Sequence, residues 1–358
     1  MTTHITVVKF GGTSIQDADA FERVAQIVKA KKKSPLVVVV SAMSGVTDAL
    51  IATFRGVSAH GARESVRRLD EHFDRHLLVG LRLSSARFKQ LQSLIEITRA
   101  GIFELLERAA SNHTPDLRLH DAIASHGEQL AANLLTSVLQ EHGLPAGYVD
   151  ARRCMITNDK FGNAEPLLDA VQQRTVVQLL PLVNAKRVPV LGGFIGATRD
   201  GLTTTLGRGS SDYSATLIGA ALHARAIEIW TDVDGIQTAD PRLVKSTRTV
   251  PHISYAEAAQ LAKLGARVMH PKMIEPVVAA RIPIRILNSH APQHPGTLIS
   301  DDGSHPNGGV KAIAHKMAGE SAIVGCIGHG LRINFRVEPD AVGPIVRQLH
   351  AAIFEQAS

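Results

Sequence analysis

A lysine and two glycines near the N-terminus form the first group that could handle phosphate. Lys9 lies in a short apolar run, Ile5 to Phe10, and Gly11 and Gly12 follow it directly. Glycines let the backbone approach phosphate oxygens, a following helix start offers unpaired N–H groups, and lysine adds a point charge. The segment matches neither GxxxxGK[ST] nor GxGxxG, and a plain tight turn explains it at least as well.

Three charged residues elsewhere have the chemistry to hold an amino acid beside a phosphate. Arg208 stands between two glycines, which suits a guanidinium that clamps a carboxylate through two parallel hydrogen bonds. Glu128 could accept hydrogen bonds from a substrate ammonium. Each has a structural alternative: a surface arginine for Arg208, a helix N-cap for Asp212, and a dipole-favoured helix start for Glu128. On spacing alone, these structural alternatives are favoured.

The elements that must position these residues follow a strand, glycine loop, helix pattern. Residues 5–10 form a short apolar run around Lys9, and residues 36–40 are continuously apolar, which is typical of a parallel strand covered on both faces. Residues 21–28 show helical spacing. Ligands bind at the carboxyl ends of such strands, so the loops are expected to converge on one edge. Further strands are predicted at 187–191, 226–230 and 281–288, with a helix at 213–224 and an exit loop at 41–48.

The remaining segments suggest a helical layer, a linker and a small tail. Helix formers dominate residues 62–143, apart from the turn residues at 112–115. Proline, histidine, glycine and aspartate in 291–309 indicate a linker or exposed loop. The tail is expected to contain apolar segments at 322–327 and 333–337 and a helix at 342–354.

Composition excludes several classes of protein. The chain has 358 residues, 44% of them hydrophobic and 20% charged, enough for one large domain and a smaller module. Its longest aliphatic run is far below the roughly 20 residues of a membrane helix. Two distant cysteines and no HExxH motif indicate neither a disulfide framework nor a metal site. The net charge of +6 is dispersed. We therefore expect a cytoplasmic protein that binds small anions and contacts neither nucleic acid nor membrane.

A series of segments closely resembles the aspartate kinases of the amino acid kinase family. They occur in the family's order and span roughly residues 4 to 300. The segments are VVKFGGTS (7–14), VVVVSAMSGVTDAL (37–50), SHGEQLAANLL (125–135), GGFIGAT (192–198), TTTLGRGSSDYSA (203–215), WTDVDGIQTADPR (230–242), LGARVMHPKMIEPV (264–277) and NSHAPQHPGTLI (288–299).

The resemblance implies a fold and a domain organisation. The fold is an α/β, three-layer αβα sandwich with a mainly parallel sheet, followed by a small truncated ACT-like α+β tail. The implied catalytic domain covers 1–300, the linker 301–309 and the tail 310–358. Family members usually end in two ACT modules that sense an end-product amino acid, and here the middle of that region is missing. The resemblance thus suggests a kinase that lysine and threonine do not inhibit.

The resemblance also implies a role for each matching residue. Lys9 would hold the transferring phosphoryl group, and Asp212 would organise Lys9 or magnesium, the two forming the catalytic pair. Thr47, Glu128 and Arg208 would bind the amino acid, with Glu128 at its ammonium and Arg208 at its α-carboxylate. ATP, with Mg²⁺, would contact Lys9, Phe10, Gly11, Gly12, Ser41, Thr231, Asp232, Gln237, Arg242 and Arg267.

Two further departures from the family pattern concern the site: one at Ser210, which together with the shortened tail leaves the acceptor open, and one at Gln237, which affects stacking on the nucleotide. Ser210 replaces the second glycine of the usual GRGGSD, which would tighten the loop that aims Arg208. Gln237 stands where the family usually has tyrosine beside the nucleotide. L-Aspartate is the leading acceptor. Another amino dicarboxylate and a non-catalytic regulatory homologue are the alternatives, and a homodimer through the kinase domain is compatible with the sequence.

Overall fold

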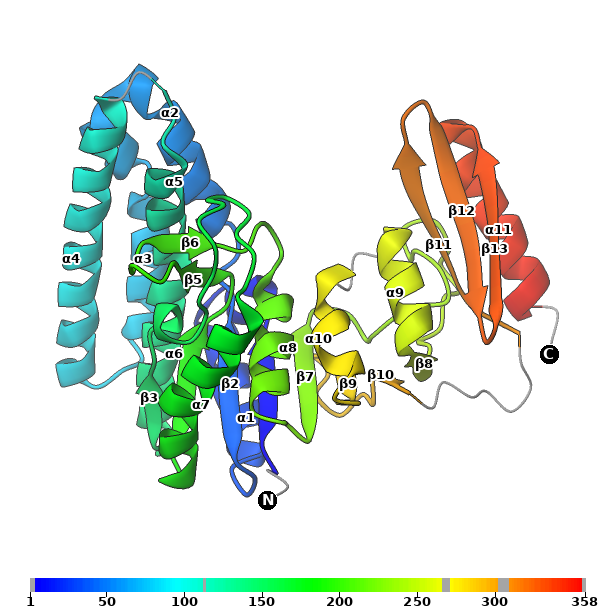
Figure 1. Cartoon of the computed structure of the whole chain (residues 1–358), viewed down its shortest axis with the longest axis horizontal. Coiled ribbons are helices and arrows are strands. Elements are labelled where there is room, and N and C mark those ends of the chain that lie inside the picture. The colour runs from blue at the N-terminus through cyan, green and yellow to red at the C-terminus, as the bar shows by residue number, and fades with distance from the viewer. Residues whose placement is uncertain (1–3, 112–113, 266–270, 302–308, 356–358) are drawn as a thin grey trace. The chain divides into compact units, whose positions relative to one another are not determined.

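The computed structural model describes residues 4–111, 114–265, 271–301 and 309–355, and Figure 1 shows its elements. The chain forms two compact units, Met1–Thr231 and Asp232–Ser358. The predicted linker at 301–309 lies within the second unit, and its residues 302–308 fall outside the described part of the chain.

The first unit is built on five parallel strands. They are ordered β3 (Ala146–Tyr148), β4 (Val188–Gly192), β2 (Leu36–Val40), β1 (Thr6–Phe10) and β7 (Ala226–Thr231). Every residue of β1 and β2 is buried, as the continuous apolar run predicts for β2, and in β1 the burial includes Lys9. Four predicted strands are thereby confirmed in this unit.

Helices cover both faces of these strands. Helix α6 (His126–Glu141) packs on β2, β3 and β4, and α1 (Ala18–Ala30) packs against α6. Helices α7 (Leu168–Asn184) and α8 (Ser211–Ala221) pack on β4, β2, β1 and β7. The predicted three-layer αβα fold with a mainly parallel sheet is confirmed.

The predicted helical layer lies beside the sheet (Figure 1). It comprises α2 (Val46–Arg67), α3 (Asp70–Gly80), α4 (Ser85–Ala110) and α5 (Leu117–Ala124). The helical region begins earlier than predicted, because Gly45 adopts a left-handed conformation with φ of 83° and starts α2 directly after it. The exit loop of β2 is therefore shorter than the predicted range 41–48.

A short hairpin precedes α8. Strands β5 (Ile195–Ala197) and β6 (Thr203–Thr205) pair antiparallel, and neither was predicted, since three residues carry almost no periodicity. Helix α8 begins at Ser211, so Asp212 lies in its first turn. The N-cap alternative for Asp212 is therefore wrong: Ser210 occupies that position.

The second unit contains two groups of strands. In the first, β10 (Thr297–Ser300) pairs antiparallel with β9 (Ile284–Asn288) and parallel with β8 (His252–Ser254), near α9 (Tyr255–Lys263) and α10 (Glu275–Val278). The predicted loop at 291–309 is wrong over β10. Strand β10 has only four residues, and the proline and glycine just before it favour the prediction of a loop.

The predicted small α+β tail is confirmed. Strands β11 (Val310–Ala318), β12 (Ser321–Gly328) and β13 (Leu331–Val337) form an antiparallel sheet, on which α11 (Val342–His350) packs. A turn at Ala351–Glu355 continues the helix. The buried core of this sheet and helix also includes residues from an earlier segment of the second unit. It contains Ala239, Val244, Ile313, Ala322, Val324, Cys326, Val342 and Val346. Short turns complete the chain at Gly12–Ile15, Ala151–Arg153, Pro271–Met273 and Pro339–Ala341.

Among the described residues, no helix combines the length and the apolar character needed to cross a bilayer.

Candidate active site

Lys9 and Asp212 form a buried ion pair at the end of β1. The Lys9 Nζ lies 2.6 Å from the Asp212 Oδ1, and the two side chains are only 9% and 14% exposed. A lysine in a strand buried on both faces requires a partner, since an unpaired buried charge is strongly destabilising. The first turn of α8 supplies that partner and so fixes the position of the ammonium.

The glycine turn is held between β7 and the exit of β2. The Gly11 N–H donates to the carbonyl of Trp230 at 3.0 Å, and the Ser44 N–H donates to the carbonyl of Gly12 at 3.2 Å. A Cβ atom at Gly12 would lie 2.9 Å from the Ala42 carbonyl oxygen. This close packing therefore requires glycine at position 12. A close approach of the backbone to phosphate would require glycine for the same reason.

Phe10 and Ser41 lie beside this turn. The Ser41 N–H donates to the carbonyl of Phe10 at 3.1 Å. The Phe10 ring is fully buried and stacks on Trp230 with ring centroids 6.2 Å apart. Any contact of Phe10 with a nucleotide would therefore have to come from its backbone.

Glu128 is a buried carboxylate with one unused oxygen. It lies in the first turn of α6, is 3% exposed, and its Oε1 accepts a long hydrogen bond of 3.4 Å from the Thr47 hydroxyl. Its Oε2 has no partner. Burial raises the pKa of Glu128 to about 8, although hydrogen bonds from the Ala42 backbone and Thr47 and the charge of Lys9 oppose the shift. A cationic donor would satisfy this site.

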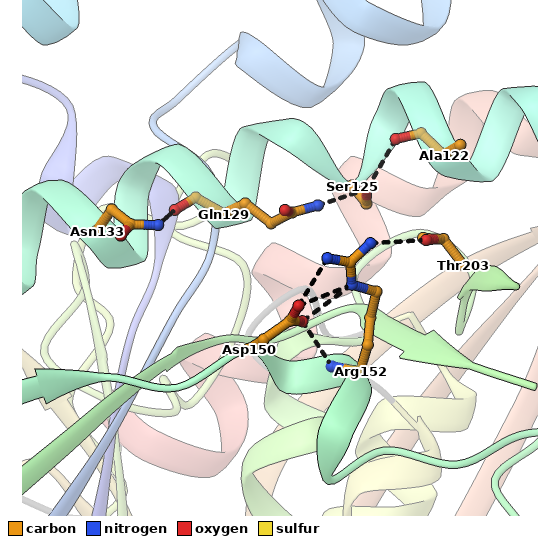
Figure 2. A network of polar contacts seen from close by, with 7 residues as sticks. All are labelled: Ala122, Ser125, Gln129, Asn133, Asp150, Arg152 and Thr203. Carbon is orange, nitrogen blue, oxygen red and sulfur yellow. Dashed lines mark hydrogen bonds and ion pairs between the residues drawn. The ribbon is translucent and has the colours of Figure 1, made fainter. Parts of the chain in front are cut away.

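The helix that carries Glu128 is braced at its start (Figure 2). The Ser125 hydroxyl donates to the Ala122 carbonyl at 2.7 Å and accepts from the Gln129 amide at 2.8 Å. The Asn133 amide donates to the Gln129 carbonyl at 2.8 Å. These bonds link the end of α5 to the first turns of α6 and hold Glu128 in register.

Arg208 lies in an exposed loop between two left-handed glycines. Gly207 and Gly209 have φ values of 87° and 77°, which favour glycine. The Arg208 Nη2 lies 2.6 Å from the Asp48 Oδ1, with side chains 81% and 60% exposed. Such an exposed ion pair contributes only about 0–1 kcal/mol, so a substrate carboxylate can replace Asp48 at little cost.

Ser210 closes this loop without strain. Its hydroxyl donates to the Gly207 carbonyl at 2.6 Å, and its backbone has φ of −84°, a region open to any residue. Serine therefore fits where the family usually has glycine, and it adds a hydrogen bond that glycine cannot make.

One cleft of about 970 Å³ in the first unit joins most of the predicted acceptor and phosphate residues. Lys9 lies close enough for its charge to lower the pKa of Glu128, and its partner Asp212 follows the cleft residue Ser211. The structure thus brings the lysine, the glutamate and the arginine together. The cleft is lined by Gly12, Ser41, Thr47, Asp48, Glu128, Arg208 and Ser211, among others.

The residues predicted to contact the nucleotide away from the glycine turn are divided between the two units. Thr231 ends β7, whereas Asp232, Gln237 and Arg242 belong to the second unit. The Gln237 amide donates to the Thr249 hydroxyl at 3.0 Å. Arg242 pairs with the carboxylate of Asp240. Arg267 lies outside the described residues, and these nucleotide roles stay predictions.

Two residues that sequence reasoning missed also line the cleft. Asp48 pairs with Arg208 over a separation of 160 residues, which no local spacing could reveal. Phe194 has φ of 64°, an unfavourable region for a bulky side chain, and its N–H donates to the Ser214 hydroxyl at 2.9 Å. Backbone strain of this kind clusters at functional sites, but it leaves no signal in the sequence.

Residues 4–288 match the sequence model of the amino acid kinase family. Lysine-sensitive aspartokinase 3 of Escherichia coli (strain K12) is 40% identical over 306 residues, covering 85% of this chain and 66% of that protein. Aspartokinase 2, chloroplastic, of Arabidopsis thaliana is 35% identical over 301 residues, covering 82% and 54%. This chain thus spans between half and two thirds of the length of these relatives.

The structure of E. coli aspartokinase III in complex with aspartate and ADP superposes with a TM-score of 0.87 and 29% identity, covering 98% of this chain and 100% of that chain. The aspartate kinase of Clostridium acetobutylicum gives a TM-score of 0.71 and 27% identity, covering 87% and 67%. The resemblance to aspartate kinases is confirmed. With its parallel sheet, glycine turn and matching motifs, this chain belongs to the amino acid kinase family.

Proposed function

We propose that this chain transfers the γ-phosphate of ATP to the side-chain carboxylate of L-aspartate, forming 4-phospho-L-aspartate. The observation that carries the proposal is the unpartnered Oε2 of buried Glu128 in the cleft that Arg208 also lines. An α-amino acid supplies an ammonium for Glu128 and an α-carboxylate for Arg208. Its side-chain carboxylate is then free to approach the phosphoryl group beside Lys9.

The proposed reaction needs no general base. A carboxylate acceptor with a pKa of ~4 is already ionised at neutral pH. Catalysis then requires in-line placement of two anions and neutralisation of the phosphoryl oxygens, for which Lys9 and the backbone N–H groups that follow Gly11 are suited. The hydroxyl acceptors of other kinases would call for a positioned base.

Magnesium fits this site as a partner of ATP. Among the described residues, no cluster of three or more histidine, cysteine, aspartate or glutamate side chains could hold a metal ion alone. Mg²⁺ is commonly held by one or two carboxylates together with substrate phosphates, and Asp212 is the carboxylate placed beside Lys9. When bound, the ion would neutralise phosphate charge.

The relatives support the choice of aspartate. The E. coli aspartokinase III structure holds aspartate and ADP, and the curated relatives described above are aspartokinases. The alternative of another amino dicarboxylate rests on Ser210, which closes the Arg208 loop by a bond to the Gly207 carbonyl, and on the shortened tail.

An acyl phosphate trapped with hydroxylamine tests the proposal directly. L-Aspartate with Mg-ATP should give a hydroxamate, and succinate, which lacks the ammonium, should give far less. L-Glutamate and D-aspartate complete the panel and identify another acceptor if there is one. Lys9→Ala should lower kcat by about 10²–10³-fold. No hydroxamate with L-aspartate would refute the aspartate assignment, and unchanged turnover of Lys9→Ala would support a non-catalytic homologue.

We also infer that lysine and threonine do not inhibit this chain. The support is the tail, whose segments resemble the start and the end of the family's ACT region without its middle and form one three-stranded sheet and one helix. The curated relative from E. coli is named lysine-sensitive. Initial rates with L-aspartate should be unchanged by millimolar lysine or threonine, and strong inhibition by either amino acid would refute the inference.

A further inference from the structure

Asp121, on α5, has a fully buried carboxylate shared by four groups. Its Oδ1 accepts from the Thr205 hydroxyl at 2.8 Å and lies 3.0 Å from the His120 Nδ1. Its Oδ2 accepts from the backbone N–H groups of Thr205 and Gly162 at 2.9 and 2.8 Å. A buried carboxylate is tolerated only when it is well hydrogen-bonded, and here both oxygens are used twice.

All three residues that supply these four groups line the substrate cleft. His120, Gly162 and Thr205 all belong to the cleft wall, and Gly162 and Thr205 lie 41 and 84 residues from Asp121 along the chain. The turn and β6 are also bonded to each other, since the Ala164 N–H donates to the Thr205 carbonyl, and Asp121 ties α5 to both. A single side chain behind the wall therefore joins a helix, a turn and the end of β6.

Asp121 also fixes one end of the loop that carries Arg208. The Thr205 N–H donates to Asp121, and the Thr205 carbonyl accepts from the Ala164 N–H at 2.8 Å. At the other end, the Ser210 hydroxyl closes the loop onto Gly207. Between these anchored ends only a few residues remain to set where Arg208 points.

We propose that Asp121 is a positioning residue of the acceptor site. It does not touch substrate; it holds Thr205 so that Arg208 emerges where it can bind the α-carboxylate, and it orients His120 in the cleft wall. The ionised carboxylate can only accept from the Nδ1–H of His120, which fixes the orientation of the imidazole. This inference rests on the proposed function, because it assigns Asp121 to the binding of the amino acid.

Asp121→Ala and Asp121→Asn separate the role of the hydrogen bonds from that of the charge. In Asp121→Asn, the amide oxygen can still accept from both backbone N–H groups. The amide nitrogen can donate to the Thr205 hydroxyl and to His120 in its other tautomer. Asp121→Ala leaves all four partners without their acceptor. Asparagine should thus preserve the wall, and alanine should release it.

Steady-state kinetics with varied amino acid and varied ATP provide the main readout. Asp121→Ala should raise KM for the amino acid about tenfold or more, with kcat and KM for ATP within about threefold of wild type. This pattern is expected when the amino acid is bound more weakly in the ground state and in the transition state by the same amount. Asp121→Asn should stay within about threefold of wild type in all constants. Should Asp121→Ala fail to fold, Thr205→Val removes only the hydroxyl bond and should raise the same KM by about 3- to 10-fold.

Asp150→Ala is the matched control. Asp150 binds Arg152, whose Nη1 donates to the Thr203 hydroxyl at 3.1 Å, at the opposite end of β6 (Figure 2). Its loss should leave KM for the amino acid unchanged. The proposal would be overturned if Asp150→Ala raised KM for the amino acid as much as Asp121→Ala does, or if Asp121→Ala raised KM for ATP equally. It would also be overturned if neither Asp121→Ala nor Thr205→Val changed KM for the amino acid.

Hydrogen exchange tests the same proposal without turnover. In folded Asp121→Ala, the amides of Thr205 and Gly162 should exchange faster than in wild type, and exchange in α1 should be unchanged. Unchanged exchange at both amides would refute the positioning role even if the kinetics shift. A wild-type protein that phosphorylates no amino acid would contradict the proposed function and leave this exchange measurement as the test of Asp121.

Discussion

Burial favours the protonated form of Glu128, although a lysine lies nearby. The charge of Lys9 is engaged by Asp212 at 2.6 Å, so it only partly offsets the cost of burying a second carboxylate. Burial is the larger effect and raises the pKa of Glu128 to about 8. The acceptor site is therefore close to neutral at this residue until a cation enters.

Binding of the amino acid should release a proton from Glu128. At pH 7, a group with a pKa of 8 is roughly nine-tenths protonated, and a substrate ammonium beside it favours the charged form. Calorimetry in buffers of different ionisation enthalpy should show release of close to one proton at pH 7 and almost none above pH 9. Glu128→Gln, which keeps the size of the side chain, should abolish the release. Equal proton release in wild type and Glu128→Gln would contradict this assignment.

Individual site residues were predictable only where a motif carried them. Lys9, Glu128 and Arg208 were found through the resemblance, because spacing alone favoured a structural explanation for each. Asp121 was missed, since a single aspartate in a helix has no distinguishing pattern. Its role depends on backbone groups that the fold brings to it from distant segments.

At the scale of elements, the glycine turn is limited by backbone contact. Gly12→Ala should lower the free energy of unfolding by about 1–3 kcal/mol, because its Cβ would lie 2.9 Å from the Ala42 carbonyl oxygen. Chemical denaturation without ligand measures this change.

Gly11→Ala is the matched control for the turn. Its Cβ would lie 3.5 Å from the nearest atom, the Trp230 carbonyl oxygen, which is an ordinary contact. Its φ of −72° suits any residue. The free energy of unfolding should therefore change by no more than about 0.5 kcal/mol. A larger loss for Gly11→Ala than for Gly12→Ala would show that packing against the β2 exit does not govern this turn.

Long elements were predictable and short ones were not. The strand β2 follows from its continuous apolar run, β1 from a short apolar run around Lys9, and the helical layer from its composition. The hairpin of β5 and β6 and the strand β10 have three or four residues each, too few for a period to stand out from nearby glycine and proline.

At the scale of the whole molecule, His76 should make the chain sensitive to acid. It lies fully buried in α3, its Nδ1 is 2.6 Å from the His72 carbonyl oxygen, and its Nε2 has no partner. Burial lowers its pKa to about 4. Because the folded pKa is below the unfolded value of about 6.5, stability is greatest above pH 6.5 and falls as the pH drops toward 4.

The contribution of His76 can be isolated by substitution. A shift of about 2.5 pH units corresponds to about 3 kcal/mol lost between pH 6.5 and pH 4. His76→Leu should therefore show a flatter decline of unfolding free energy over this range than wild type does. The exposed His60 supplies the control, and His60→Leu should keep the wild-type slope. A wild-type slope in His76→Leu would exclude His76 as the cause.

Trp230 is the only tryptophan in the chain, and its ring is almost completely shielded between Phe10 and the Lys31 ammonium. Its own carbonyl holds the Gly11 N–H. The indole emission of the unlabelled protein therefore originates at one place, directly behind the turn expected to receive phosphate. If ATP binds at this turn as proposed, stopped-flow fluorescence should follow its arrival in real time, with no dye and no engineered reporter.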